Sequence, residues 1–127
     1  MSKNIELIKK YNEGFANKDM QAVRALLNDD FTFNGPMMQF NSPDEMIAGL
    51  QNCPFEASHA LKHIIEQDNH VVQIFDWVVT APFEASIEMC EHLQIKDNTI
   101  IAGNLYFDTA KMPADAMGNA QCSTVEK

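Results

Sequence analysis

The stretch VVQIFDWVVTAPFEASIEMCEHLQI, residues 71–95, decides the fold class because it holds two strand patterns joined by a short turn. Apolar and polar residues alternate along 87–95, whereas both phases of 71–80 are mostly apolar, a pattern typical of a strand covered on both faces. Similar strand patterns span 60–66 and 99–108, and turn residues separate all four. The sequence therefore predicts an antiparallel meander of four strands.

Three helices are predicted ahead of the meander. Apolar residues at spacings of three and four predict a helix over 3–16, and Asp19 is a suitable N-cap for a second, shorter one. The sequence SPDE at 42–45 forms the capping box of a third, and a short strand at 31–33 lies between. Helices followed by hairpin-linked strands predict the α+β class, with three N-terminal helices packed on a curved antiparallel sheet.

Composition and charge exclude several functional classes. The chain has 127 residues, of which 46% are hydrophobic; this suits one domain, to which we assign residues 1–111, with 112–127 as a loosely held C-terminal tail. A net charge of -9 opposes binding to nucleic acid or to an anionic membrane surface. Three widely spaced cysteines, a polar N-terminal segment and the lack of a long apolar run predict a soluble, reduced, cytoplasmic protein.

Glu91 breaks the alternation of its strand. It falls in the phase of Met89 and Leu93, whose side chains should be buried. A buried carboxyl must be paired, protonated or facing a cavity, because an isolated ion in apolar surroundings costs several kcal/mol or more. Glu91 is therefore a candidate acid or hydrogen-bond donor, and the alternative is a structural carboxylate satisfied near a sheet edge.

The segment KKYNEGFANKDMQAVRALLNDDFTFNGP, residues 9–36, resembles the SnoaL-like and ketosteroid isomerase branch of the nuclear-transport-factor-2-like superfamily. The resemblance extends into the sheet through Phe107 and implies a cone-shaped fold with an internal pocket. In ketosteroid isomerases a tyrosine and a protonated aspartate donate hydrogen bonds to the enolate oxygen, while a second aspartate moves the proton. The resemblance places Tyr11 and Glu91 in the two hydrogen-bonding roles.

The base of that family has no counterpart at its usual position. Gly35 stands there, and Asn34 before it cannot act as a general base near neutral pH. Asp76 is the substitute base that we predict, about 13 Å along the sheet from Glu91. The alternative for Asp76 is an acid turned outward by a bulge or solvated at the mouth of a cavity.

This role for Asp76 depends on the strand register. With Thr80 paired to Phe83 across a turn at 81–82, Val72 lies opposite Glu91. Asp76 then shares the inward phase of its strand. The predicted ligand-lining residues are apolar: Phe31, Phe33, Met38, Phe55, Ile74, Val78, Met89 and Phe107. The alternative is that these side chains, like Tyr11, are ordinary core.

The same register predicts a homodimer. Because helices cover only one face of the sheet, Phe75 and Trp77 on the other face need a partner, and a second copy of the chain is predicted to supply it. The alternative is cover by the C-terminal tail. His59 and His63 are four residues apart, but the strand pattern around them disfavours a metal pair. No cofactor and no metal are implied.

Three functional hypotheses remain open. The first is a pocket that binds a mostly apolar, carbonyl-containing small molecule and catalyses isomerisation, cyclisation or dehydration by cofactor-independent proton transfer. The second is a non-catalytic ligand-binding or interaction module, in which Glu91 only orients the ligand. The third is a structural dimerisation domain whose cavity is filled by Phe and Met side chains.

Overall fold

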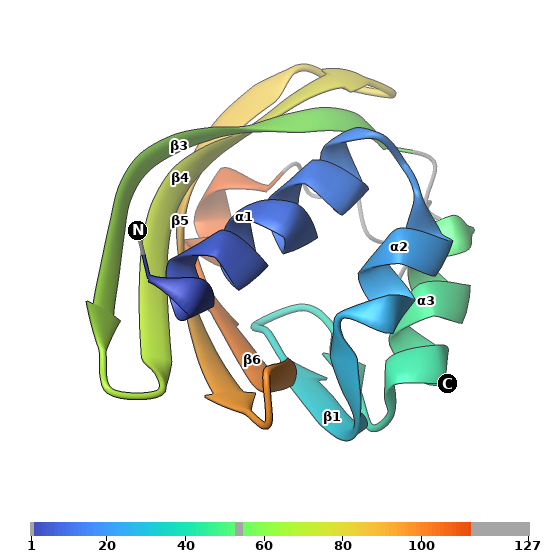
Figure 1. The fold of residues 1–127 in the computed structure, drawn as a ribbon. Coiled ribbons are helices and arrows are strands. Elements are labelled where there is room, and N and C mark those ends of the chain that lie inside the picture. Colours follow the sequence, from blue (N-terminus) through green and yellow to red (C-terminus); the bar gives the residue numbers. More distant parts are fainter. Residues whose placement is uncertain (1, 53–54, 113–127) are drawn as a thin grey trace.

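The computed structural model describes residues 2–52 and 55–112, and in these ranges three α-helices lie inside the curve of one sheet (Figure 1). The elements in chain order are α1 (Lys3–Ala16), α2 (Met20–Ala25), β1 (Leu27–Asn34), β2 (Gln39–Phe40), α3 (Pro43–Gln51), β3 (Glu56–Gln67), β4 (His70–Ala81), β5 (Ala85–Lys96), β6 (Thr99–Tyr106) and a short 3-10 helix, η1 (Thr109–Lys111). The predicted α+β class is confirmed. The predicted tail lies, apart from Met112, outside the described residues.

The helix boundaries follow from their capping residues. The Asp19 side chain accepts a hydrogen bond from the Ala22 amide at the start of α2, and Ser42 Oγ accepts one from the Glu45 amide at the start of α3. Glu45 reaches back to the amide of Asn41, one residue before the N-cap. These contacts fix where the chain enters each helix, and α1 begins and ends as predicted.

The sheet has the strand order β2-β1-β6-β5-β4-β3, and it stays open rather than closing into a barrel. The predicted meander forms β3 to β6, in which consecutive strands pair antiparallel. β1 pairs parallel to β6 and is longer than predicted, beginning at Leu27, and the short edge strand β2 was not predicted. The long connection permits parallel pairing, because β2, α3, β3, β4 and β5 lie between β1 and β6 in the chain.

The register between β4 and β5 differs by one residue from the prediction. Val79 pairs with Ala85, so the connection is longer than the assumed turn, and Gln73 lies opposite Glu91. A one-residue slip moves every side chain of a strand to the opposite face. Phe75 is therefore buried on the concave face, and the prediction that it lies on the outer face with Trp77 is wrong.

Two apolar clusters hold the molecule together. The larger one packs the helices onto β1, β5 and β6, and the smaller one comprises Phe75, Ile87, Met89 and Met112. No helix within the described residues is long and apolar enough to cross a membrane. The space between the two clusters is where the candidate site lies.

Candidate functional site

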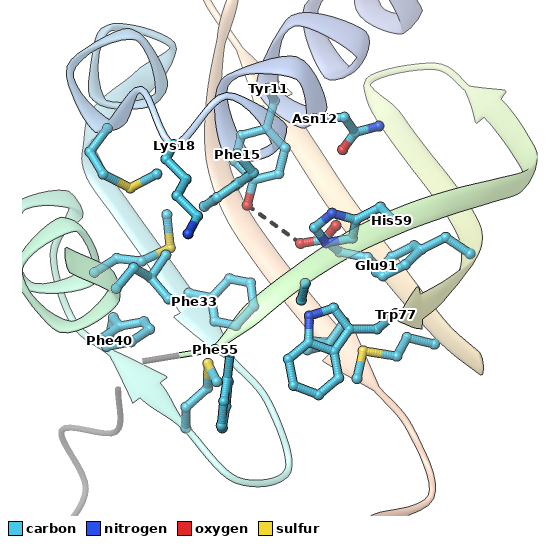
Figure 2. A pocket seen from close by; sticks show the side chains of 18 of the residues that line it. Tyr11, Asn12, Phe15, Lys18, Phe33, Phe40, Phe55, His59, Trp77 and Glu91 are labelled. Atoms are coloured by element: carbon cyan, nitrogen blue, oxygen red, sulfur yellow. Dashed lines mark hydrogen bonds between the residues drawn. The ribbon is translucent and has the colours of Figure 1, made fainter. Parts of the chain in front are cut away.

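A cavity of about 640 Å³ lies between the helices and the concave face of the sheet. Its walls are mostly aromatic and sulfur-containing: Tyr11, Phe15, Phe33, Phe40, Phe55, Phe75, Trp77, Phe107, Met20, Met37, Met38, Met46, Met89 and Met112. Exposed polar residues at the α1–α2 corner and the end of α3 line its rim. Figure 2 shows Lys18 reaching from that corner toward the interior. A cavity of this size and composition suits a small, largely apolar ligand.

A hydrogen-bonded network forms the buried polar end of the cavity, and Figure 2 shows its Tyr11–Glu91 bond. The Tyr11 hydroxyl donates to Glu91 Oε2 over 3.4 Å, and Gln73 Nε2 donates to Glu91 Oε1 over 2.7 Å. Gln73 and Asn12 join their side-chain amides at 2.8 and 3.1 Å. The four residues come from α1, β4 and β5, so the packing of α1 on the sheet assembles them.

Burial sets the protonation chemistry of this end. Glu91 is 6% exposed, and desolvation raises its pKa from 4.5 to about 7, while hydrogen bonds from Gln73 and Tyr11 lower it in part. Desolvation and the nearby Glu91 carboxylate raise the pKa of Tyr11 well above its usual range. Glu91 is thus poised between donor and acceptor near neutral pH, and Tyr11 remains a donor.

His59 adds a second titratable group to the cavity wall. Its ring packs against Phe75 at a centroid distance of 4.8 Å and lies 6.4 Å from the ring of Phe15. Packing against these rings desolvates the imidazole and lowers its pKa, although the residue is exposed when its whole surface is considered. The neutral form of His59 is therefore favoured.

Comparison with known proteins explains this combination of fold and pocket. The family model described as the SnoaL-like domain matches residues 8–102, most of the chain. The chain belongs to this SnoaL-like family. The predicted resemblance is confirmed at that level. No curated protein matches the sequence.

Solved structures similar to this SnoaL-like chain share its fold at low sequence identity. A nuclear-transport-factor-2-like protein of unknown function from Burkholderia pseudomallei K96243 is 24% identical, with a TM-score of 0.83, and the match covers 88% of this chain and 95% of that one. A proposed SnoaL-like polyketide cyclase from Shewanella denitrificans OS-217 is 17% identical, with a TM-score of 0.78 and coverages of 91% and 96%. A proposed ketosteroid isomerase from Kribbella flavida DSM 17836 is 12% identical, with a TM-score of 0.77 and coverages of 87% and 82%. These identities establish the α+β cone fold alone.

Most residues predicted for the SnoaL-like pocket lie in its wall. Tyr11 and Glu91 meet at the polar end of the cavity, and their role toward a ligand stays a prediction. The predicted apolar residues that line the cavity are Phe33, Met38, Phe55, Met89 and Phe107. Phe31 is fully buried in the larger apolar cluster and does not line it.

Asp76 lies on the wrong face of the sheet for its predicted role as base. It pairs across strands with Glu88, and both carboxylates contact the ammonium of Lys62, at 3.3 and 3.0 Å. Ile74 and Val78 share that outer face and also do not line the cavity. The physical reason for all three errors is the one-residue slip in register.

Asn12 and Gln73 are the network residues that the sequence did not predict, and of the two Gln73 carried a signal. It belongs to the same phase as Val71 and Phe75, so a polar side chain interrupts an apolar phase there just as Glu91 does on β5. Both signals together would have placed the two residues opposite each other and corrected the register. His59 carried no comparable signal, since its strand is exposed along most of its length.

Proposed function

We propose that this SnoaL-like chain binds a flat, mostly apolar small molecule and holds its carbonyl or hydroxyl oxygen at Tyr11 and Glu91. The observation that carries the proposal is the buried network of Tyr11, Glu91, Gln73 and Asn12 at one end of an otherwise aromatic and Met-rich cavity. The four side chains satisfy one another's hydrogen bonds, which keeps a buried end of the cavity polar. A ligand oxygen is a further partner that suits two convergent donors, the Tyr11 hydroxyl and protonated Glu91.

The hydrogen-bond geometry leaves room for such a ligand. The Tyr11–Glu91 contact is long at 3.4 Å, whereas the Gln73–Glu91 contact is short at 2.7 Å. Gln73 therefore holds one carboxyl oxygen of Glu91. A ligand oxygen can replace the other as the acceptor of the Tyr11 hydroxyl with little loss of hydrogen-bond energy, because the existing bond is long. Protonated Glu91 supplies the second donor, which a pKa of about 7 makes accessible near neutral pH.

The cavity walls support a flat ligand. The rings of Phe55 and Trp77 stand edge to face at 5.4 Å, and those of His59 and Phe75 at 4.8 Å. Aromatic faces and edges of this kind pack well against planar ring systems. An open cavity of about 640 Å³ argues against the third hypothesis, a site filled by its own side chains.

Trp77 provides the assay, because it is the single tryptophan of the chain and lines the cavity. We expect β-tetralone, progesterone or emodin to change its fluorescence with saturation. Glu91→Gln and Tyr11→Phe should each weaken that binding about tenfold, the effect of losing one or two net hydrogen bonds. Glu88→Gln and Tyr106→Phe make the same changes at exposed positions outside the cavity and should bind as the wild type does. Failure of all three ligands to bind would contradict the proposal.

A homodimer and a cytoplasmic location stay predictions. The predicted interface through Phe75 and Trp77 is wrong, because both residues line the cavity. We propose that a dimer would form through the outer face of the sheet instead. Exposed Ile65 and Tyr106 lie on that outer face and support it.

A further inference from the structure

We propose that His59 is the proton acceptor of this site and that its ligand is a flat, enolisable ketone. With the ketone oxygen held by Tyr11 and Glu91, the His59 imidazole removes a proton from a carbon next to the carbonyl. The inference rests on the proposed function and on the proton-transfer hypothesis stated above, and it adds the residue that acts as the base.

A bulge in β3 directs His59 into the cavity. His59 pairs with Trp77, whose side chain lines the cavity, whereas His63 pairs with Ile74 on the outer face. The register shifts between Leu61 and His63, and an extra residue in one strand reverses the facing of all that follow. Two histidines four residues apart therefore point to opposite sides of the sheet.

Ring contacts connect His59 to the polar end. His59 packs on Phe75 and lies near Phe15, and Phe15 in turn packs edge to face on Tyr11 at 4.8 Å. Phe75 is two residues from Gln73 on the same strand face. A planar ligand that lies along these rings would have its carbonyl at Tyr11 and an adjacent carbon toward the imidazole. Figure 2 shows Tyr11, Glu91 and His59 lining the same pocket.

The imidazole is free to act as a base. Among residues 2–52 and 55–112, its nitrogens make no hydrogen bond or ion pair, and its neighbours are rings. The other titratable groups that line the cavity are Lys18 and Asp19 at the rim and Tyr11 and Glu91 at the buried end. Desolvation by the surrounding rings favours the neutral, proton-accepting form.

The carboxylates that could act as a base already bind other groups of the protein. Asp19 caps α2, Asp76 is held outside by Lys62, and Glu91 accepts hydrogen bonds from Gln73 and Tyr11. Lys18 is an exposed residue of the cavity rim. His59 is the remaining neutral base among the described residues of the cavity wall.

The step balances without a co-reactant. The carbon–hydrogen bond breaks, its electron pair forms the carbon–carbon double bond of an enolate, and the proton moves to His59. Tyr11 and protonated Glu91 donate to the enolate oxygen. The proton then returns to the same carbon, which exchanges it with solvent, or to a conjugated carbon, which isomerises the ligand.

The test follows hydrogen–deuterium exchange of β-tetralone in deuterated buffer by proton NMR. We expect the wild type to accelerate exchange and His59→Gln to reduce that acceleration about 100-fold or more, within the range of general base catalysis. Binding of β-tetralone, measured by Trp77 fluorescence, should change only a few fold. His63→Gln removes the same group from the outer face of the same strand and should exchange as the wild type does.

Chemical rescue separates loss of the base from loss of structure. His59→Ala should regain exchange when imidazole is added, and His63→Ala should show no dependence on imidazole. A wild type that binds β-tetralone without exchanging it would overturn this inference and leave the proposed function intact. A His59→Gln variant as active as the wild type would also overturn it, and a wild type that binds none of the ligands would overturn both.

Discussion

Two opposing effects determine the pKa of Glu91. Burial disfavours its charged form, while the hydrogen bonds from Gln73 and Tyr11 favour that form, and desolvation dominates to give a pKa of about 7. The same residue can therefore donate a hydrogen bond to a ligand below neutral pH and accept one above it. Which of the two states a ligand selects depends on whether its oxygen accepts or donates.

This balance predicts how stability depends on pH. The pKa of Glu91 is raised from 4.5 to about 7 in the folded state, so the folded protein holds a proton that the unfolded chain releases. The stabilisation of the folded state that comes from this proton is fully present below pH 4.5 and is lost as the pH rises through about 7. The difference between the two pKa values corresponds to roughly 3 kcal/mol of unfolding free energy. The difference in unfolding free energy between the wild type and Glu91→Gln, measured by urea denaturation, should fall by that amount across this range.

The matched control lies on the same strand. Glu88→Gln replaces the same group on the exposed outer face, so its pH profile between pH 5 and 8 should stay close to that of the wild type. A Glu91→Gln profile parallel to the wild type would mean that Glu91 is already ionised at pH 5.

At the scale of elements, two local irregularities orient the site. The bulge in β3 turns His59 inward and His63 outward, and the length of the connection after β4 decides which phase of β4 faces the cavity. Each irregularity shifts the strand pairing by a single residue. Because side chains alternate between the two faces of a sheet, that shift sets the face of every side chain beyond it.

The elements were predictable from sequence where the signal is local. Ser42 and Asp19 marked helix starts because their side chains satisfy amides three residues on. The register of β4 on β5 was not predictable from the turn alone, because proline and alanine at 81–82 fit connections of several lengths. The bulge in β3 has no local signature, since the residues on both sides of Lys62 are exposed and show no alternation of buried and exposed positions.

Close packing at the α1–α2 corner yields a stability prediction. A Cβ on Gly14 would lie 2.7 Å from Cγ2 of Val23, and Val23 is fully buried with a stiff, branched side chain. Gly14→Ala should therefore destabilise the protein by about 1–3 kcal/mol. Gly35→Ala is the control, because a Cβ there meets its neighbours at 3.5–3.6 Å, ordinary contact distances. Urea denaturation that shows equal stabilities for the two variants would contradict this packing argument.

The whole molecule presents two different sheet faces. The concave face is covered by helices and encloses the cavity. The outer face combines the charged cluster of Lys62, Asp76 and Glu88 with apolar residues that are only partly covered, among them Ile65 and Tyr106, each 57% exposed. An exposed apolar surface on a soluble domain often marks an interface.

The prediction at this scale is a homodimer through the outer face. Ile65 pairs with Val72, and Tyr106 pairs with Cys90 opposite Ile74, so these side chains spread over β3 to β6 and can meet a second copy of the same surface. Ile65→Asp places a charge in that contact without touching the cavity, and sedimentation velocity should show a monomer where the wild type sediments as a dimer. Lys9→Gln makes the same one-unit change in charge on the exposed side of α1 and should remain dimeric. A wild type that sediments as a monomer would rule out the dimer, and a dimeric Ile65→Asp would exclude this face while leaving ligand binding in the cavity unaffected.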